Sequence, residues 1–189
     1  MTSRLVLLHG WGADGEDLRP IGQSLREMVG QSLDVVTLDA PNPHPQGSGR
    51  QWYGLFPARW DDVPSAVAAL QQRLRLLDGG ESALQRTVLF GFSQGGAMAL
   101  EAGCDLPLAG VISCSGYPHP NWNPSSTHPR VLLLHGTQDA VVPFEAMAEI
   151  KSRLMQDRCL IKSFENGHTI PEEMMQPLAG FVSDVLKAC

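Results

Sequence analysis

The sequence lacks any apolar run long enough to cross a membrane. A membrane-spanning helix needs about 20 consecutive apolar residues, whereas the apolar run near the amino terminus, residues 5–8, ends in a histidine and a glycine. A run of this length is also too short for a secretory signal peptide. We therefore expect a cytoplasmic protein with no integral membrane association.

Cysteine and positive charge are also scarce. None of the four cysteines forms a C-x-x-C pair, and His119 and His128 lack the spacing of metal ligands, so the sequence predicts no metal site. The 14 lysines and arginines are outnumbered by 20 aspartates and glutamates, which gives a net charge of −6 at pH 7. An acidic chain is not typical of proteins that bind nucleic acid, so we expect no nucleic-acid partner.

Strand patterns and helix patterns alternate regularly along the chain. Short apolar runs predict buried strands over residues 4–8, 34–38, 87–92, 108–114, 130–134 and 160–164. Apolar residues at helical spacing predict helices over residues 18–29, 63–77, 94–102, 147–154 and 174–185. This alternation indicates one α/β domain over residues 1–189, with a mainly parallel sheet and helices on both of its faces. In such folds the functional site lies beyond the carboxyl ends of the strands.

A serine stands between one predicted strand and the helix that follows it, in the motif Gly91-Phe92-Ser93-Gln94-Gly95. This is the G-x-S-x-G pattern of a nucleophile elbow, a sharp turn that lifts the serine hydroxyl above the edge of the sheet. The turn brings the positions two before and two after the serine close together, so both are expected to be glycine. The helix points its positive end at the site, and the Gln94 amide is one expected oxyanion donor.

Two further residues complete a catalytic pattern, and each follows a predicted strand. Asp139 stands where an ordinary turn or helix-capping aspartate also occurs, and His168 lies in a glycine-containing loop before the last predicted helix. The order Ser93, Asp139, His168 is the chain order of nucleophile, acid and base in α/β-hydrolases. We predict a serine nucleophile with His168 as its base and Asp139 as the acid that orients the base.

The loop after the first strand, residues 9–15, is rich in glycine, so its backbone is able to approach a ligand closely. A second oxyanion donor is expected in this loop, and the Trp11 amide is the best candidate. His9 is expected to hydrogen-bond locally within the core.

Residues 39–60 form a connection that is longer than usual between elements. Four aromatic residues in this segment, Trp52, Tyr53, Phe56 and Trp60, either wall an apolar pocket or anchor the loop to the core, and both alternatives stay open. Exposed aromatic residues there would also favour a homodimer. The substrate-binding residues that we expect are Trp11, Trp52, Tyr53, Tyr117, Val141 and Ile170.

Taken together, the motifs resemble those of one known family. They are Leu8-His9-Gly10 with its glycine loop, Gly91-Phe92-Ser93-Gln94-Gly95-Gly96, Ser115-Gly116-Tyr117-Pro118, His135-Gly136-Thr137-Gln138-Asp139 and Gly167-His168. This set is similar to the phospholipase/carboxylesterase family, which includes bacterial carboxylesterases and acyl-protein thioesterases. The resemblance implies an α/β-hydrolase fold and hydrolysis of carboxylic esters or thioesters by a Ser-His-Asp triad, without a metal or organic cofactor.

The same resemblance implies roles residue by residue. The nucleophile is Ser93, the acid Asp139 and the base His168, the oxyanion amides fall on Trp11 and Gln94, and the aromatic substrate loop matches residues 51–53. The sequence departs from the family at Trp11, where leucine is common, and in its shorter length. A preference for long lipid chains therefore does not carry over.

Two other functions remain open. The same triad is able to cleave amides, so an amidase or peptidase is the alternative within enzymes. A non-catalytic protein that binds a small molecule on a hydrolase fold is the alternative from another class.

Overall fold

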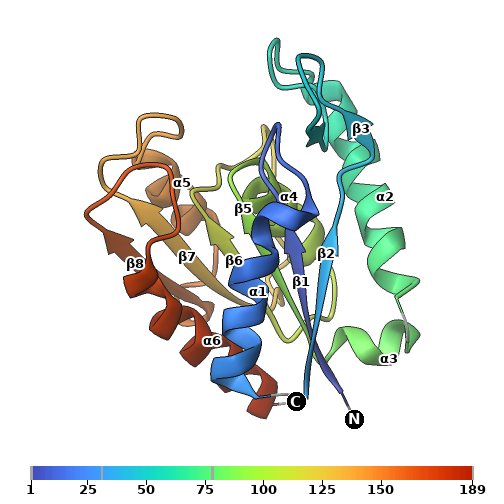
Figure 1. Cartoon of the computed structure of the whole chain (residues 1–189), viewed down its shortest axis with the longest axis vertical. Coiled ribbons are helices and arrows are strands. Elements are labelled where there is room, and N and C mark those ends of the chain that lie inside the picture. Colours follow the sequence, from blue (N-terminus) through green and yellow to red (C-terminus); the bar gives the residue numbers. More distant parts are fainter. Residues whose placement is uncertain (1, 31, 78, 189) are drawn as a thin grey trace.

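A six-stranded sheet lies at the centre of the computed structural model, which describes residues 2–30, 32–77 and 79–188 (Figure 1). Every pair of neighbouring strands in this sheet is parallel. Across the sheet the order is β2 (Leu33–Leu38), β1 (Ser3–Leu8), β5 (Thr87–Phe92), β6 (Gly110–Cys114), β7 (Arg130–Gly136) and β8 (Cys159–Phe164). The predicted α/β fold with a mainly parallel sheet is confirmed.

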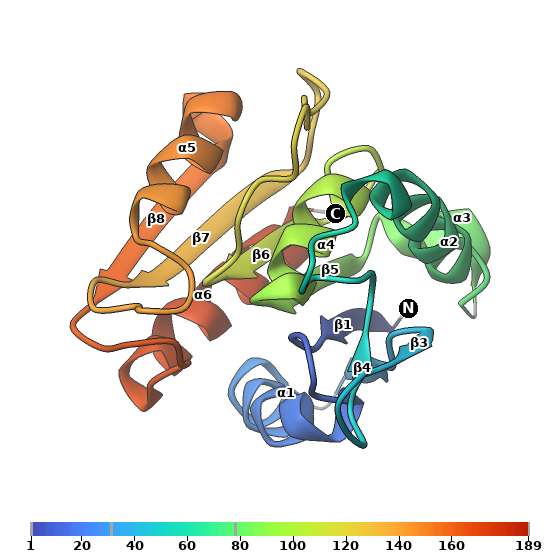
Figure 2. The same cartoon turned by 90° about the horizontal axis from the view of Figure 1, so that it is seen from above.

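Helices cover both faces of the sheet (Figure 2). One face carries α1 (Gly15–Val29) and α6 (Met175–Lys187), and the other carries α2 (Val63–Arg75), α4 (Gln94–Gly103) and α5 (Glu145–Arg153). The short elements are β3 (Asn42–Pro43), β4 (Arg50–Gln51), α3 (Gly80–Leu84) and the 3₁₀ helices Trp60–Asp62, Gln156–Arg158 and Glu172–Met174. None of the helices in the described ranges is long and apolar enough to cross a membrane.

Alternate residues of each strand point to opposite faces, which gives the protein two apolar clusters. Val6 and Leu8 of β1 pack with α2, α4 and α5, whereas Leu5 and Leu7 pack with α1 and α6. All four side chains are fully buried. Because both faces are covered, strand residues of β1, β5 and β7 that point either way are mostly apolar, which gives these strands nearly continuous apolar runs in the sequence. The edge strands β2 and β8 are less covered and carry Asp34 and Lys162.

The sequence pattern did not predict the short strands β3 and β4, the short helix α3, or the 3₁₀ helices Trp60–Asp62 and Gln156–Arg158. Strands β3 and β4 pair antiparallel within the long connection of residues 39–60. Each has two residues, which are too few to show an alternating pattern. Helix α3 follows Gly79, whose φ of 94° is left-handed, and its five residues are too few to show helical periodicity.

The strand order explains where a site forms. From β1 the chain moves to β2 on one side, and from β5 it moves outward to β8 on the other side. The loops after β1 and β5 therefore diverge and leave a crevice between them, which is where open α/β sheets bind ligands. Because all six strands are parallel, the loops after β7 and β8 emerge at the same edge.

Leu89 in β5 and Leu160 in the edge strand β8 form a matched pair for testing the core. Leu89 is fully buried and Leu160 is 46% exposed. Truncation of a buried leucine leaves a cavity, so we expect Leu89→Ala to lower the free energy of unfolding by about 2–5 kcal/mol. The control Leu160→Ala should change it by about 0.5 kcal/mol or less. Urea unfolding measures both, and equal losses would contradict this account of the core.

Candidate active site

Ser93 lies in the turn between β5 and α4. Its φ of 55° and ψ of −118° are strained values for a residue with a side chain. A Cβ atom added to Gly91 would lie 2.0 Å from the carbonyl oxygen of Gly95, and one added to Gly95 would lie 2.2 Å from that of Leu8. Close backbone approach therefore requires both glycines. The amide of Ser93 donates to the carbonyl of Cys114 at 2.9 Å, which ties the turn to β6.

Asp139 and His168 meet across the loops after β7 and β8. His168 Nδ1 lies 2.8 Å from Asp139 Oδ2, and the carboxylate is buried. Asp139 Oδ1 accepts hydrogen bonds from the amides of Val141 and Val142, each at 2.9 Å. Burial raises the pKa of Asp139, but the hydrogen bonds from His168 and the two amides outweigh it, so the pKa lies below its ordinary value. Asp139 is therefore held ionised beside the imidazole.

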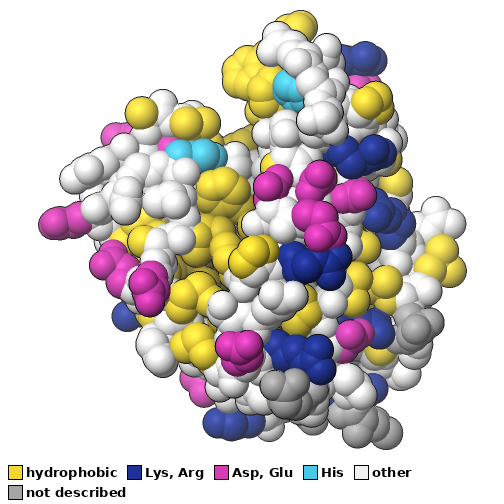
Figure 3. Space-filling model, in the orientation of Figure 1, with side chains coloured by type: hydrophobic (Ala, Val, Ile, Leu, Met, Phe, Trp, Pro, Cys, Tyr) yellow, Lys and Arg dark blue, Asp and Glu magenta, His cyan; other side chains and the backbone are white. Residues whose placement is uncertain are grey.

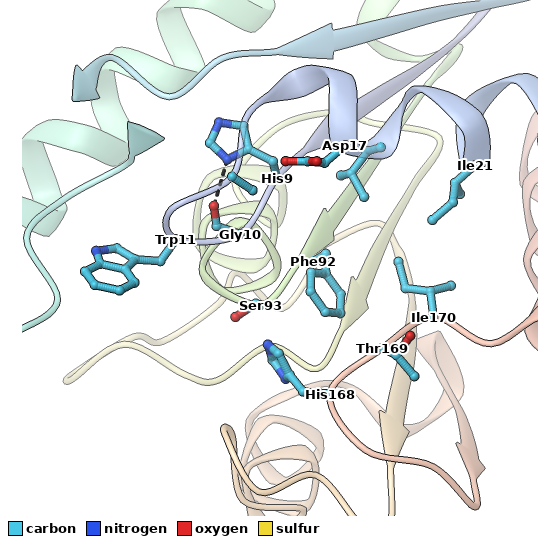
Figure 4. Close-up of a pocket in the computed structure, with 12 residues that line it drawn as sticks. His9, Gly10, Trp11, Asp17, Ile21, Phe92, Ser93, His168, Thr169 and Ile170 are labelled. Carbon is cyan, nitrogen blue, oxygen red and sulfur yellow. Dashed lines mark hydrogen bonds between the residues drawn. The ribbon is translucent and has the colours of Figure 1, made fainter. Parts of the chain in front are cut away.

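The ring of His168 is turned towards the Ser93 hydroxyl (Figure 4). Figure 4 marks no hydrogen bond between these two side chains, and in enzymes without bound substrate such contacts are often long and shorten on binding. Because Asp139 occupies Nδ1, Nε2 is the ring nitrogen left to face the serine. The Phe92 ring packs against the imidazole with a centroid distance of 4.8 Å.

Two backbone amides near the Ser93 turn were predicted as oxyanion donors. Within the described ranges, the amides of Trp11 and Gln94 donate to no protein acceptor. Gln94 is the first residue of α4, so its N–H belongs to the positive end of the helix. The loop that carries Trp11 touches the turn, since a Cβ added to Gly10 would lie 3.3 Å from the Ser93 Cβ. The fold thus brings both predicted oxyanion donors close to the serine.

A pocket of about 350 Å³ opens beside Ser93. It lies between the loop after β1 and helix α1 on one side and the loop after β8 on the other (Figure 4). Ser93 and His168 lie in its wall together with Trp11 and Ile170, two of the residues expected to bind substrate. Further apolar side chains in the wall are Leu18, Ile21 and Phe92.

Trp52 and Tyr53, which were also expected at the substrate site, lie in the core instead. They are 2% and 1% exposed and do not line this pocket. The Trp52 amide donates to Gln94 Oε1 at 3.0 Å, and Gln94 Nε2 donates to the Tyr53 carbonyl at 2.9 Å. Trp52 Nε1 also donates to the carbonyl of His9 at 2.9 Å. Of the two alternatives left open for this segment, these two side chains follow the second and anchor it to the core.

Tyr117 and Val141 do not line this pocket either. The Tyr117 hydroxyl lies 2.6 Å from that of Tyr53, which is 2.8 Å from His119 Nε2. His119 Nδ1 in turn lies 2.5 Å from Glu101 Oε2. Burial raises the pKa of Tyr117 to about 12, so its hydroxyl stays protonated within this network. The Val141 side chain is 66% exposed, and its backbone amide donates to Asp139.

Other histidines have structural partners. His9 Nδ1 lies 2.7 Å from the Gly10 carbonyl, the local hydrogen bond that the sequence predicts. His128 Nε2 accepts a hydrogen bond from the Met155 amide at 3.0 Å. In the part of the chain that the structure describes, no group of three or more His, Cys, Asp or Glu side chains is arranged to hold a metal ion.

Residues 1–186 match the sequence family described as phospholipase/carboxylesterase. The chain belongs to this family. The crystal structure of esterase PE8 superimposes with a TM-score of 0.77 at 28% identity and covers 98% of this chain and 93% of that one. The prediction of a hydrolase of the carboxylesterase and thioesterase type is confirmed at the level of the family.

The similar proteins differ in how much of their own length this chain covers. An acyl-protein thioesterase 1 from Yarrowia lipolytica is 29% identical in an alignment of length 168, which covers 76% of this chain and 72% of that protein. The biotin biosynthesis bifunctional protein BioHC of Cellvibrio japonicus is 31% identical in an alignment of length 127, which covers 61% of this chain. The chain spans only about a fifth, 21%, of the length of BioHC.

Sequence reasoning assigned only the backbone of Gln94 and missed its side chain. The G-x-S-x-G pattern leaves that position free, so the motif carries no signal for a side-chain role. His135 was also missed. Its Nε2 lies 2.9 Å from the carbonyl of Val142 and braces the turn whose amides bind Asp139.

Gln94→Ala tests whether the Gln94 side chain anchors the long connection of residues 39–60. The variant leaves the Trp52 amide and the Tyr53 carbonyl buried without partners, at roughly 1–3 kcal/mol of unfolding free energy for each group. We also expect lower kcat/KM on esters, because Gln51, which accepts a hydrogen bond from the Trp11 indole, adjoins the segment that Gln94 anchors. The control Gln71→Ala removes one hydrogen bond, from a half-buried side chain to the Ala102 carbonyl. Urea unfolding should show a clearly smaller loss for the control, and equal losses would contradict the anchoring role.

The lowered pKa of Asp139 links its charge to folding. A carboxyl with a lower pKa in the folded protein stabilises the fold above its unfolded value, about pH 3.9, and the contribution is lost as pH falls through the folded value. We expect Asp139→Asn to be less stable than wild type near neutral pH, and this difference in unfolding free energy should shrink below about pH 4. Urea unfolding across this range measures it, and a difference that grows with acid would count against the assignment.

Proposed function

We propose that residues 1–189 act as a single hydrolase domain that cleaves carboxylic esters, thioesters included, with Ser93 as nucleophile, His168 as base and Asp139 as the orienting acid. One observation carries the proposal. The buried Asp139 carboxylate lies 2.8 Å from His168 Nδ1, while the ring is turned towards Ser93 at a strained turn. A nucleophile, a base beside it and a third group that orients the base are the parts of covalent acyl transfer.

In the first step, Ser93 Oγ attacks the carbonyl carbon of the ester while His168 Nε2 takes the hydroxyl proton. A bond forms between Oγ and this carbon, and the carbonyl electron pair moves onto the oxygen. When the pair returns, the bond to the alcohol or thiol breaks, and His168 gives its proton to the leaving group. Water then attacks the acyl-enzyme by the same route, which releases the acid and restores Ser93.

Charge develops at two places during this reaction, and each has a partner. The amides of Trp11 and Gln94 bind the oxyanion, and one such donor contributes on the order of 10²–10³ to kcat. The ionised Asp139 stabilises the imidazolium that forms on His168. Because both donors are backbone groups, they are in place before the substrate arrives.

The substrate class follows from the pocket and from the family. The pocket has a volume of about 350 Å³, and the bulky Trp11 lies in its wall. This limited space supports acyl groups smaller than long lipid chains as substrates. The likeness to an acyl-protein thioesterase 1 supports thioesters among the substrates. A cytoplasmic location, a homodimer and the amidase alternative stay predictions from the sequence.

Ser93→Ala tests the nucleophile. Removal of the attacking oxygen should lower kcat on p-nitrophenyl esters by about 10⁴–10⁶, the range found when a triad serine is removed. The matched control is Ser65→Ala, because Ser65 is exposed on α2 and its hydroxyl binds only a nearby backbone carbonyl. The control should keep wild-type activity, and both variants should keep the wild-type circular dichroism spectrum.

A fluorophosphonate probe separates a wrong nucleophile from a wrong substrate. The probe should label wild type and Ser65→Ala but not Ser93→Ala. Near-full ester hydrolysis by Ser93→Ala would rule out the proposed mechanism. Labelling of Ser93 without turnover of any ester, thioester or matched amide would instead favour the non-catalytic binding protein.

A further inference from the structure

We infer that Asp17 sets the charge selectivity of the pocket beside Ser93. The substrate group that lies along α1 is apolar and either neutral or positively charged, and groups that end in a carboxylate are disfavoured there. This inference rests on the proposed function, because it names the substrate class of the same site.

Asp17 lines the pocket from the first turn of α1. Helical residues four apart share a face, so Ile21 continues the same wall. Figure 4 shows both residues on α1, with Ile170 of the loop after β8 also at the pocket. Among the lining residues that the structure describes, Asp17 is the only ionisable one besides His9 and His168. The pocket therefore combines an apolar wall with one carboxylate.

His9 does not offset this negative charge. Its Nε2 accepts a hydrogen bond from the amide of Ala40 at 3.0 Å, so that nitrogen carries no proton. Its Nδ1 lies 2.7 Å from the Gly10 carbonyl and donates to it. Burial lowers the pKa of His9 below its ordinary value, although nearby carboxylates act in the opposite direction. The ring is therefore neutral in the pocket wall.

The amino terminus of α1, which would otherwise attract an anion, is already occupied by carboxylates. The amide of Glu16 donates to Asp14 Oδ1 and the amide of Gly15 donates to Asp39 Oδ1, each at 2.9 Å. Asp17 Oδ2 accepts from the Asp14 amide at 3.0 Å. A substrate anion in the pocket would meet these negative charges in place of free N–H donors.

The cations near this face are engaged elsewhere. Arg19 forms an ion pair with Glu16. Arg50 and Arg73 donate to backbone carbonyl groups, and none of the three arginines lines the pocket. Figure 3 shows acidic side chains grouped beside the apolar hollow. Asp17 is the carboxylate that lines the pocket, and its charge makes the local potential there more negative.

The expected effect is modest, because Asp17 is exposed at the rim and water and salt screen its charge. At low ionic strength, we expect kcat/KM to change by about threefold for each unit of charge on the substrate. Matched cationic and anionic esters differ by two units, so their kcat/KM values should differ by about tenfold.

Two series of esters, each varied only at one terminus, test this selectivity. The acyl series consists of the p-nitrophenyl esters of heptanoic acid, 6-ammoniohexanoic acid and adipic acid, with neutral, positive and negative ends. The alcohol series consists of the butyrate esters of 3,3-dimethylbutanol, choline and 4-hydroxybutanoic acid, followed by acid release. The series with the larger charge effect identifies whether the acyl or the alcohol group lies along α1.

Asp17→Asn is the test variant, and Glu16→Gln is its matched control. Asparagine keeps an oxygen that is able to accept from the Asp14 amide, so the cap of α1 is retained. Glu16→Gln removes one negative charge from the same helical turn, at a residue that does not line the pocket. We expect Asp17→Asn to remove most of the cation-over-anion ratio, and because this ratio is taken within one variant, any change in turnover common to all the esters cancels. Glu16→Gln should keep most of that ratio.

A wild-type ratio near one, or equal changes in Asp17→Asn and Glu16→Gln, would overturn the inference, while turnover of the neutral esters would leave the proposed function standing. Absence of turnover for every ester would overturn the proposed function and this inference with it. Added salt should bring the wild-type ratio towards that of Asp17→Asn. A ratio that does not respond to salt would show a steric preference and would also overturn the inference.

Discussion

No side chain fits at Gly91 or Gly95, because the backbone of the turn passes so close to itself and to the end of β1. This contact holds Ser93 at its strained φ of 55° and starts α4 directly behind it. It also presses the loop after β1 against the turn. Backbone contacts therefore bring the loop that carries Trp11 and the first residue of α4, Gln94, to the same serine, as the proposed oxyanion role of their amides requires.

Polar side chains hold the loops around this turn. The Gln94 amide group bonds the backbone of residues 52 and 53, and the Trp52 indole bonds the carbonyl of His9. The Trp11 indole reaches Gln51 Oε1 at 3.0 Å. Hydrogen bonds of this kind are strong in a buried, low-dielectric setting and expensive to leave unmade. Residues 51–53 of the long connection are therefore part of the scaffold of the site and do not wall its pocket.

Two histidines line the pocket, and their surroundings give them different chemistry. Both ring nitrogens of His9 have backbone partners, so this ring is a neutral structural element. His168 has a buried carboxylate at one nitrogen and leaves the other for the serine. The surroundings of Asp139 and Asp17 also differ. Asp139 is buried under three hydrogen bonds, whereas Asp17 lies exposed at the rim, where its charge acts on whatever enters.

Local sequence by itself determined the fold class and the three candidate catalytic residues. Strands buried on both faces are nearly continuous apolar runs, and a residue that follows such a run lies at the carboxyl edge of the sheet. Ser93, Asp139 and His168 were therefore identifiable from their positions after strands, together with the G-x-S-x-G motif and their order in the chain. No repeating sequence pattern predicts which way a side chain points when it lies on an irregular loop or at the end of a helix. Trp52 turns into the core and Asp17 faces the pocket because segments far apart in the chain pack there, and only the tertiary structure decides those contacts.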